Sequence, residues 1–334
     1  MLGDLMKEAE NLLTINDLTV EFTSDRETIH AVNHVSLEIN RGETMGLVGE
    51  TGAGKTSIAK AILRILPKPQ GRIKGGQILF NGKDLLTMSE NEIQKIRGNK
   101  ISMIFQDPMS ALNPVVSVGK QISEAIGLHQ KLSKSDIKEM TVKMLEMVGI
   151  PGSRYSEYQH QFSGGMKQRV IIAMALACRP ELLLADEPTT ALDVTIQAQV
   201  LGMIEKLKSE LNTSMLLITH DLGIVAETCN KVAVIYAGEI IEYAGVEEIF
   251  DNPTHPYTIG LFGSLPSADG NKEKRLRPIT GMMPNPANLP HGCKFAERCP
   301  HACGECRENN VEFAAVKEGH GVRCIKSRRA EEAI

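Results

Sequence analysis

The feature that most constrains the fold is a glycine-rich turn between an apolar run and a helical pattern. The segment MGLVGETGAGKTSIAKAIL, residues 45–63, begins like a buried strand and continues with small and apolar residues at helical spacing. Between the two halves lie Gly49, Gly52 and Gly54, which let the backbone wrap closely. A strand that passes through such a turn into a helix is a building unit of α/β folds.

The rest of the chain agrees with a largely parallel, buried sheet. Strand-like runs occupy 12–22, 28–39, 43–49, 181–187 and 214–220, and hairpins are expected at 75–85 and 232–245. Residues 112–160 are helical in pattern. From residue 251 onward the sequence becomes Pro-rich and irregular. We therefore predict a domain of residues 1–264, with a helical subdomain at about 112–166, and a C-terminal extension of residues 265–334.

Composition excludes several classes of protein. The net charge of -4 gives no basic footprint for nucleic acid. The N-terminus has neither the positive start nor the apolar core of a signal peptide, and no apolar run approaches the roughly 18 residues of a membrane span. We expect a cytosolic protein, in which clustered cysteines bind metal or do redox work more often than they form disulfides.

The glycine-rich turn matches G-x-x-x-x-G-K-[ST], a phosphate-binding pattern, in the strand-to-helix context that the pattern requires. Its amides and the helix N-terminus supply partial positive charge to an anion. Lys55 would reach the β- and γ-phosphates of a nucleotide, and Thr56 would offer its hydroxyl to Mg²⁺. The expected phosphate-binding residues are Gly49, Glu50, Thr51, Gly52, Ala53, Gly54, Lys55, Thr56 and Ser57.

Polar residues at the ends of three other apolar runs fit the same chemistry. Asp186 fits the carboxylate that anchors Mg²⁺, and Glu187 is placed to act as general base on the attacking water. Gln106 could reach Mg²⁺ or water, and His220 could touch the γ-phosphate. The segment FSGGMKQ places Ser163, Gly164 and Gly165 before a helix, either as an anion site or as a simple N-cap.

In this order the motifs resemble those of the ATP-binding cassette (ABC) ATPases, whose D-loop aspartate corresponds to Asp193. The resemblance covers about residues 12–250. It implies a RecA-like core with an antiparallel β-subdomain and a helical subdomain, and a head-to-tail dimer in which Ser163, Gly164 and Gly165 serve the partner's ATP. It also calls for an adenine-stacking aromatic residue, for which Phe22 is the candidate. The usual signature glutamine is replaced by Met166, to which no role is assigned.

The tail resembles that of bacterial dipeptide and oligopeptide importer ATPases, with nickel importers as close relatives. The resemblance rests on NPTHPYTIGLFGSLP, on CKFAERCP and on a late cysteine. It implies a peripheral subunit on the cytoplasmic face of the membrane, bound to two permease subunits and to a second ATPase, identical or not. An extracytoplasmic binding protein would deliver the peptide.

Five of the seven cysteines lie in this tail, at spacing C-x₅-C-x₃-C-x₂-C-x₁₇-C. Four thiolates can hold zinc or an iron–sulfur cluster, and spacing alone does not separate the two. The resemblance selects Cys293, Cys299, Cys306 and Cys324 and favours a [4Fe-4S] cluster, which would act as a structural staple or as a redox sensor. Cys178 and Cys229 lie in apolar helical contexts and are expected to pack in the core.

Two other functions remain open at this point. One is a soluble, non-transport ABC ATPase of DNA repair or translation, although the single cassette, the missing heptads and the net acidity speak against it. The other is an inactive regulatory cassette, which the presence of Lys55, Asp186, Glu187 and His220 disfavours.

Overall fold

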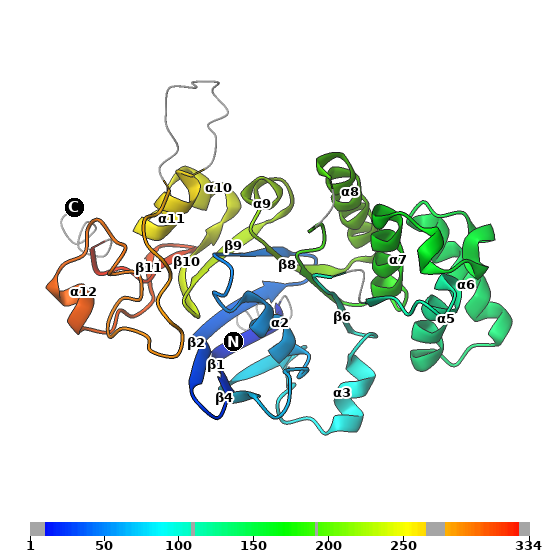
Figure 1. The fold of residues 1–334 in the computed structure, drawn as a ribbon, viewed down its shortest axis with the longest axis horizontal. Coiled ribbons are helices and arrows are strands. Elements are labelled where there is room, and N and C mark those ends of the chain that lie inside the picture. Colours follow the sequence, from blue (N-terminus) through cyan, green and yellow to red (C-terminus); the bar gives the residue numbers. More distant parts are fainter. Residues whose placement is uncertain (1–10, 108–110, 191–192, 265–277, 327–334) are drawn as a thin grey trace, which may run out of the picture. The chain divides into compact units, whose positions relative to one another are not determined.

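The computed structural model describes residues 11–107, 111–190, 193–264 and 278–326 (Figure 1). The chain divides into two compact units, each built from several segments. The first unit comprises Met1–Leu12, Ile39–Thr44 and Asp84–Ile218, and the second comprises Leu13–Glu38, Met45–Lys83 and Thr219–Ile334. The predicted domain boundary at 265 lies outside the described residues.

The core of the second unit is a set of neighbouring strands that read β11-β12-β10-β9-β3. Strand β3 (Thr44–Val48) is buried throughout and runs parallel to β9 (Lys231–Tyr236), while β9 pairs antiparallel with β10 (Glu239–Gly245). Continuous apolar runs of this kind are typical of parallel strands that are covered on both faces. Helix α2 (Lys55–Ile62) follows β3 directly after the glycine-rich turn.

A second, four-stranded sheet has the order β2-β1-β4-β5. Its members are β1 (Asn11–Thr23), β2 (Thr28–Asn40), β4 (Gly71–Phe80) and β5 (Lys83–Asp84), and β1 pairs antiparallel with β4. The expected hairpin turn is present, since Asn81 and Gly82 both have positive φ, of 50° and 72°.

The first unit contains the parallel strands β6 (Ile101–Ile104), β7 (Leu182–Asp186) and β8 (Ser214–Thr219), all continuously buried. Its helices are α3 (Glu90–Ile96), α5 (Val118–His129), α6 (Lys134–Met147), α7 (Gly164–Leu176) and α8 (Val194–Leu211). Two short 3₁₀ turns, at Gly152–Ser156 and Gln159–Gln161, precede α7. Helices α5, α6 and α7 pack on one another (Figure 1).

The region after residue 220 is more ordered than the sequence suggested. It contains α9 (Leu222–Thr228), α10 (Val246–Asp251), α11 (Pro256–Phe262), α12 (Gly304–Glu308), β11 (Ala314–Lys317) and β12 (His320–Val322). The expectation of an irregular tail from residue 251 is therefore wrong in part. Strand β12 pairs with β10 and extends the sheet of the second unit. These elements are too short to produce a readable hydrophobic period, and β11 and β12 are defined by their pairing with each other and with β10.

A buried polar cluster fixes the hairpin of β11 and β12 to the sheet. His320, with a side chain 2% exposed, faces Glu242 at 2.8 Å through Nε2 and Glu248 at 3.2 Å through Nδ1. Glu242 is itself fully buried and accepts the backbone N–H of His255 at 2.9 Å. Each polar group therefore has a partner, as buried polar groups require.

No helix in the described parts of the chain combines the length and the apolar character needed to cross a membrane.

Candidate functional site

The glycine-rich turn of the second unit is shaped by close backbone approaches. A Cβ atom on Gly54 would lie 2.3 Å from the carbonyl oxygen of Ala31, and one on Gly49 would lie 2.2 Å from that of Ile235. Gly54 also has a φ of 106°, a conformation that other residues adopt only under strain. Glycine is therefore required at both ends of the turn for steric reasons.

Lys55 lies inside the turn that it ends. It is 6% exposed, and its Nζ donates to the carbonyl oxygens of Gly49 at 2.7 Å and Glu50 at 3.0 Å. The ammonium group is thus encircled by the loop at the N-terminus of α2, where the helix dipole adds positive potential. Thr56 and Ser57 follow in the first turn of the same helix. This arrangement can bind a polyphosphate.

The turn is also supported by residues much later in the chain. The backbone N–H of Glu50 donates to the hydroxyl of Tyr257 at 3.1 Å, across 207 residues. Burial raises the pKa of Tyr257, so the phenol stays neutral and hydrogen-bonding. Sequence reasoning missed Tyr257, because a contact between distant segments leaves no local pattern.

Tyr257 belongs to an aromatic cluster that the sequence did not predict. Its ring centroid lies 4.7 Å from that of Tyr236 and 5.4 Å from that of Phe295. His255 caps α11 by accepting the N–H of Tyr257 at its Nδ1, 3.0 Å away. Burial lowers the pKa of His255 to about 3, which keeps the imidazole neutral and able to accept this bond.

Two further candidates lie in the second unit. Phe22, on β1, is partly buried and pairs with Gly71 of β4. His220 follows β8 and is exposed, one residue before Asp221, whose side chain caps α9 by accepting from the N–H groups of Gly223 and Ile224. Both residues are accessible for contact with a ligand.

The first unit holds the two acidic candidates. Asp186 ends β7 and is 2% exposed. Glu187 follows with a φ of 48°, and its N–H donates to the carbonyl of Ile218 at 2.8 Å. A left-handed conformation is uncommon for a non-glycine residue, and here the backbone hydrogen bond to Ile218 accompanies it.

The carboxylate of Glu187 is held by two donors. Gln106 Nε2 and Thr190 Oγ1 each donate to Glu187 Oε2, both at 2.9 Å. A carboxylate fixed by two hydrogen bonds has a defined direction in which to accept a proton. The structure thus brings together two of the predicted catalytic residues, Gln106 and Glu187, and adds Thr190, which sequence reasoning did not select.

The Ser-Gly-Gly turn and the predicted D-loop aspartate also lie in the first unit. Ser163 caps α7 by accepting the N–H of Met166 at 3.4 Å, and Asp193 caps α8 by accepting that of Ile196 at 3.0 Å. A Cβ atom on Gly165 would lie 2.8 Å from Ile196. The caps satisfy helix-end donors, and Gly165 allows the two helix starts to approach.

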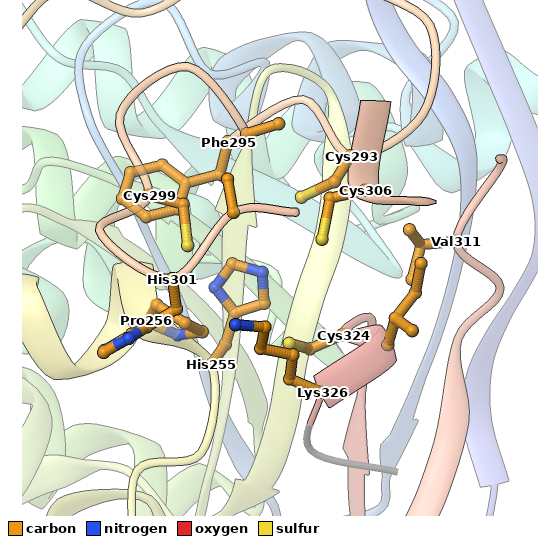
Figure 2. Close-up of a pocket in the computed structure, with 13 residues that line it drawn as sticks. His255, Pro256, Cys293, Phe295, Cys299, His301, Cys306, Val311, Cys324 and Lys326 are labelled. Carbon is orange, nitrogen blue, oxygen red and sulfur yellow. The ribbon is translucent and has the colours of Figure 1, made fainter. Parts of the chain in front are cut away.

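The four selected cysteines of the tail line one small pocket in the second unit (Figure 2). Cys293, Cys299, Cys306 and Cys324 share it with His255, Phe295 and His301. Burial, with a smaller contribution from the nearby thiols of Cys324, Cys306 and Cys299, raises the pKa of Cys293 to about 11.

Cys303 stands apart from that pocket lining, although its sulfur lies 3.4 Å from that of Cys306. No group of three or more His, Cys, Asp or Glu residues in the described part of the chain has the arrangement of a metal site. The iron–sulfur centre therefore stays a prediction. Cys178 and Cys229 are buried, as expected of core residues.

Two family models match the chain. The model described as ABC transporter matches residues 32–190, and the model described as oligopeptide/dipeptide transporter, C-terminal region, matches residues 241–306. The second match includes Tyr257 and Phe295 of the aromatic cluster and three of the four pocket cysteines.

Curated relatives agree over nearly the whole length. A probable peptide ABC transporter ATP-binding protein of Sinorhizobium fredii is 47% identical over 322 residues, which is 96% of each chain. The oligopeptide transport ATP-binding protein AppD of Bacillus subtilis is 48% identical, covering 94% of this chain and 96% of the relative. The dipeptide transport ATP-binding protein DppD of the same organism is 46% identical, covering 97% and 98%. The chain belongs to the ABC transporter family. The predicted resemblance to peptide-importer ATPases is confirmed.

Solved structures confirm the predicted ABC fold. The structure of cbiO1 from Clostridium perfringens, part of an ABC transporter complex, has a TM-score of 0.63 at 26% identity, covering 75% of this chain and 95% of that one. The dimeric ATP-binding cassette MJ0796 has a TM-score of 0.63 at 24% identity and covers 70% of this chain and 99% of that one. The fold likeness thus spans most of this chain.

Proposed function

We propose that this chain is the ATP-hydrolysing subunit of an importer for dipeptides or oligopeptides. One observation carries the proposal: a phosphate-binding turn with its lysine inside the loop occurs in the same chain as a tail matched by the oligopeptide/dipeptide transporter model. The runner-up is an importer ATPase for nickel or another small solute, and a soluble, non-transport ABC ATPase ranks below it.

In this proposal the phosphates of ATP bind the loop from Gly49 to Ser57, and Thr56, Asp186 and Gln106 would hold Mg²⁺. The ion would neutralise charge on the phosphates. Glu187 takes a proton from the attacking water, with Gln106 and Thr190 orienting its carboxylate, and His220 contacts the γ-phosphate. Phe22 stacks on the adenine.

The remaining residues serve a second copy or a second, non-identical ATPase. Ser163, Gly164, Gly165 and Asp193 would face the ATP that is held by the phosphate loop of that partner. ATP binding closes the pair and hydrolysis reopens it. The two membrane permeases would bind this pair at the cytoplasmic face, and an extracytoplasmic binding protein would deliver the peptide. No nucleic acid takes part.

We retain residues 1–264 as the nucleotide-binding domain, with a helical subdomain at about 112–166, and residues 265–334 as the extension.

Uptake of a labelled peptide by cells that carry this chain with its permeases tests the transport proposal. Lys55→Ala removes the ammonium from the phosphate loop and should abolish uptake, because the loop then loses its cation. Lys131→Ala, at an exposed lysine, is the matched control and should transport normally. Loss of nickel uptake in Lys55→Ala, with peptide uptake unchanged, would favour the runner-up.

We further propose that Cys293, Cys299, Cys306 and Cys324 hold a [4Fe-4S] cluster, with Zn²⁺ as the alternative. The presence of all four cysteines in the lining of one pocket supports this, because four cysteines suit either centre. A buried thiol with a raised pKa stays protonated unless a cation lies beside it, and a bound metal would supply that cation. Metal binding by a segment as short and irregular as the one around Cys293 would add folding free energy.

The metal proposal is tested by measuring iron, acid-labile sulfide and zinc per chain on protein purified without oxygen. The cluster requires about four iron and four sulfide per chain, lost in Cys293→Ser. Cys303→Ser is the matched control, since Cys303 lies off the pocket, and should keep the metal. One zinc per chain without sulfide would show that the four cysteines bind Zn²⁺ and not a [4Fe-4S] cluster.

A further inference from the structure

Glu50 occupies a variable position of the phosphate-binding pattern, yet its side chain has a specific partner. Arg298 Nη1 donates to Glu50 Oε1 at 2.9 Å and to Oε2 at 3.1 Å, across 248 residues. The arginine side chain is 7% exposed and that of the glutamate is 32% exposed. Ion pairs on an open surface contribute little to stability, whereas a largely buried arginine that loses its partner leaves a costly unpaired charge.

Arg298 is held in place from several directions. Its Nε donates to the carbonyl of Thr280 at 3.0 Å, and its Nη1 reaches the hydroxyl of Tyr236 at 3.2 Å. Its guanidinium carbon lies 5.7 Å from the ring centre of Tyr236 and 5.9 Å from that of Phe295. The planar fork of arginine suits such a fixed, multiply bonded position, and a flexible lysine could not make all these contacts.

The same part of the tail meets the phosphate-binding region at two more points. A Cβ atom on Gly52, inside the loop, would lie 3.4 Å from the methyl carbon of Met283. The N–H of His30 donates to the carbonyl of Pro286 at 2.9 Å. Together with Arg298, these contacts show that residues 280–298 lie against the loop and the strand beside it.

We propose that Arg298 is a positioning residue of the ATP site, which holds the phosphate loop through Glu50 and links that loop to the cysteine pocket. The link is covalent and short, since Cys299 follows Arg298 and lines the pocket. The inference rests on the proposed binding of ATP by Gly49–Ser57. Arg298 acts through Glu50 and does not itself contact the nucleotide in this proposal.

Calorimetric titration of the full chain with Mg²⁺ and a non-hydrolysable ATP analogue tests the proposal. Arg298→Gln should raise the Kd about tenfold, a change typical of coupling between neighbouring sites. Hydrolysis at saturating ATP should change less than twofold while KM rises, because Arg298 shapes the loop and not the reacting atoms. Arg298→Lys should restore part of the affinity, since one contact to Glu50 can re-form. Arg307→Gln, an exposed arginine on α12 of the same tail, is the control and should bind normally.

A double-mutant cycle separates a direct link from general damage. Glu50→Gln alone should also weaken binding, and the double variant Arg298→Gln with Glu50→Gln should be no weaker than the worse single variant, because both remove one interaction. Normal affinity in both single variants, or fully multiplicative losses in the double variant, would overturn the proposal. If Arg298→Gln does not fold, Glu50→Gln removes the same ion pair by changing its other partner. Its Kd for the ATP analogue then tests the proposal.

Failure of the ATP-site proposal itself has a different result. The unmodified chain would then not bind the analogue, or Lys55→Ala would bind it as tightly as the unmodified chain. Either result differs from a chain that binds ATP at this loop but does not use Arg298.

Discussion

The phosphate loop and the proposed general base are held by side chains that lie at different distances along the chain. Glu50, in the loop, is held by Tyr257 and Arg298, which lie 207 and 248 residues away in the chain. Glu187 is held by Thr190, three residues later, and by Gln106, 81 residues earlier. The caps at Ser163 and Asp193 likewise reach three residues along the chain. Glu187 is therefore oriented by one nearby and one distant side chain, whereas the phosphate loop combines its local contacts with Lys55 and two contacts from much later in the chain.

This difference suggests that the two sets of contacts affect different steps, hydrolysis and nucleotide binding, which mutation can test. Residues that hold Glu187 direct the carboxylate proposed to accept a proton, so their loss should act on the rate of hydrolysis. Residues that hold the phosphate loop shape a binding surface, so their loss should act on affinity.

Glu187→Gln should have the largest effect. It removes the proposed base while keeping the side-chain shape, so hydrolysis should fall by about 10²–10⁴-fold, with MgATP binding retained. Steady-state phosphate release and analogue binding measure the two quantities. Glu210→Gln, at an exposed acid on α8, should behave like the unmodified chain. Near-normal turnover of Glu187→Gln would show that another group accepts the proton.

Gly54→Ala should come next, acting on binding. The added Cβ would meet the Ala31 carbonyl at 2.3 Å, at a φ of 106°. Local strain of this kind costs on the order of 1–3 kcal/mol, so affinity for MgATP should fall by about 10–100-fold. The matched control is Gly82→Ala, a glycine with a φ of 72° and open space around it, which should lose some stability but no affinity. Equal affinities in the two variants would contradict the steric argument.

Thr190→Val tests the support of the base. The substitution preserves the side-chain shape and removes the hydroxyl that donates to Glu187. Hydrolysis at saturating ATP should fall about tenfold, as for a lost charge-assisted hydrogen bond, with the Kd for the analogue unchanged. A raised Kd with normal turnover would show that Thr190 supports nucleotide binding and not hydrolysis, which would contradict this interpretation.

Tyr257→Phe tests the remote support and should have the smallest effect. It leaves the N–H of Glu50 without the Tyr257 hydroxyl as acceptor. The Kd for MgATP should rise about threefold, the low end of the cost of a lost hydrogen bond, because water can replace the hydroxyl in part. Turnover at saturating ATP should stay normal. A Kd equal to that of the unmodified chain would show that the loop keeps its shape without this contact.

Sequence reasoning recovered what is local. The strands at 12–22, 28–39 and 43–49 were predicted to within a few residues of β1, β2 and β3, because alternation and continuous apolar runs report burial directly. The turn at Asn81 and Gly82 was predicted from the dipeptide alone.

The tail shows where such reasoning stops. Strand β12 is three residues long and is defined by its pairing with β10, which no local pattern encodes. Helix α11 did have a readable signal, since His255 caps it and Pro256 stands at its first turn. Arg298 and Tyr257 had no such signal, because their roles depend on segments brought together only by folding.

The most direct test measures binding and turnover in parallel for the unmodified chain, Thr190→Val and Tyr257→Phe. We expect turnover to fall about tenfold in Thr190→Val at constant Kd, and the Kd to rise about threefold in Tyr257→Phe at constant turnover. A change of the same quantity in both variants would show that the contacts of Glu187 and those of Glu50 do not act separately on hydrolysis and binding.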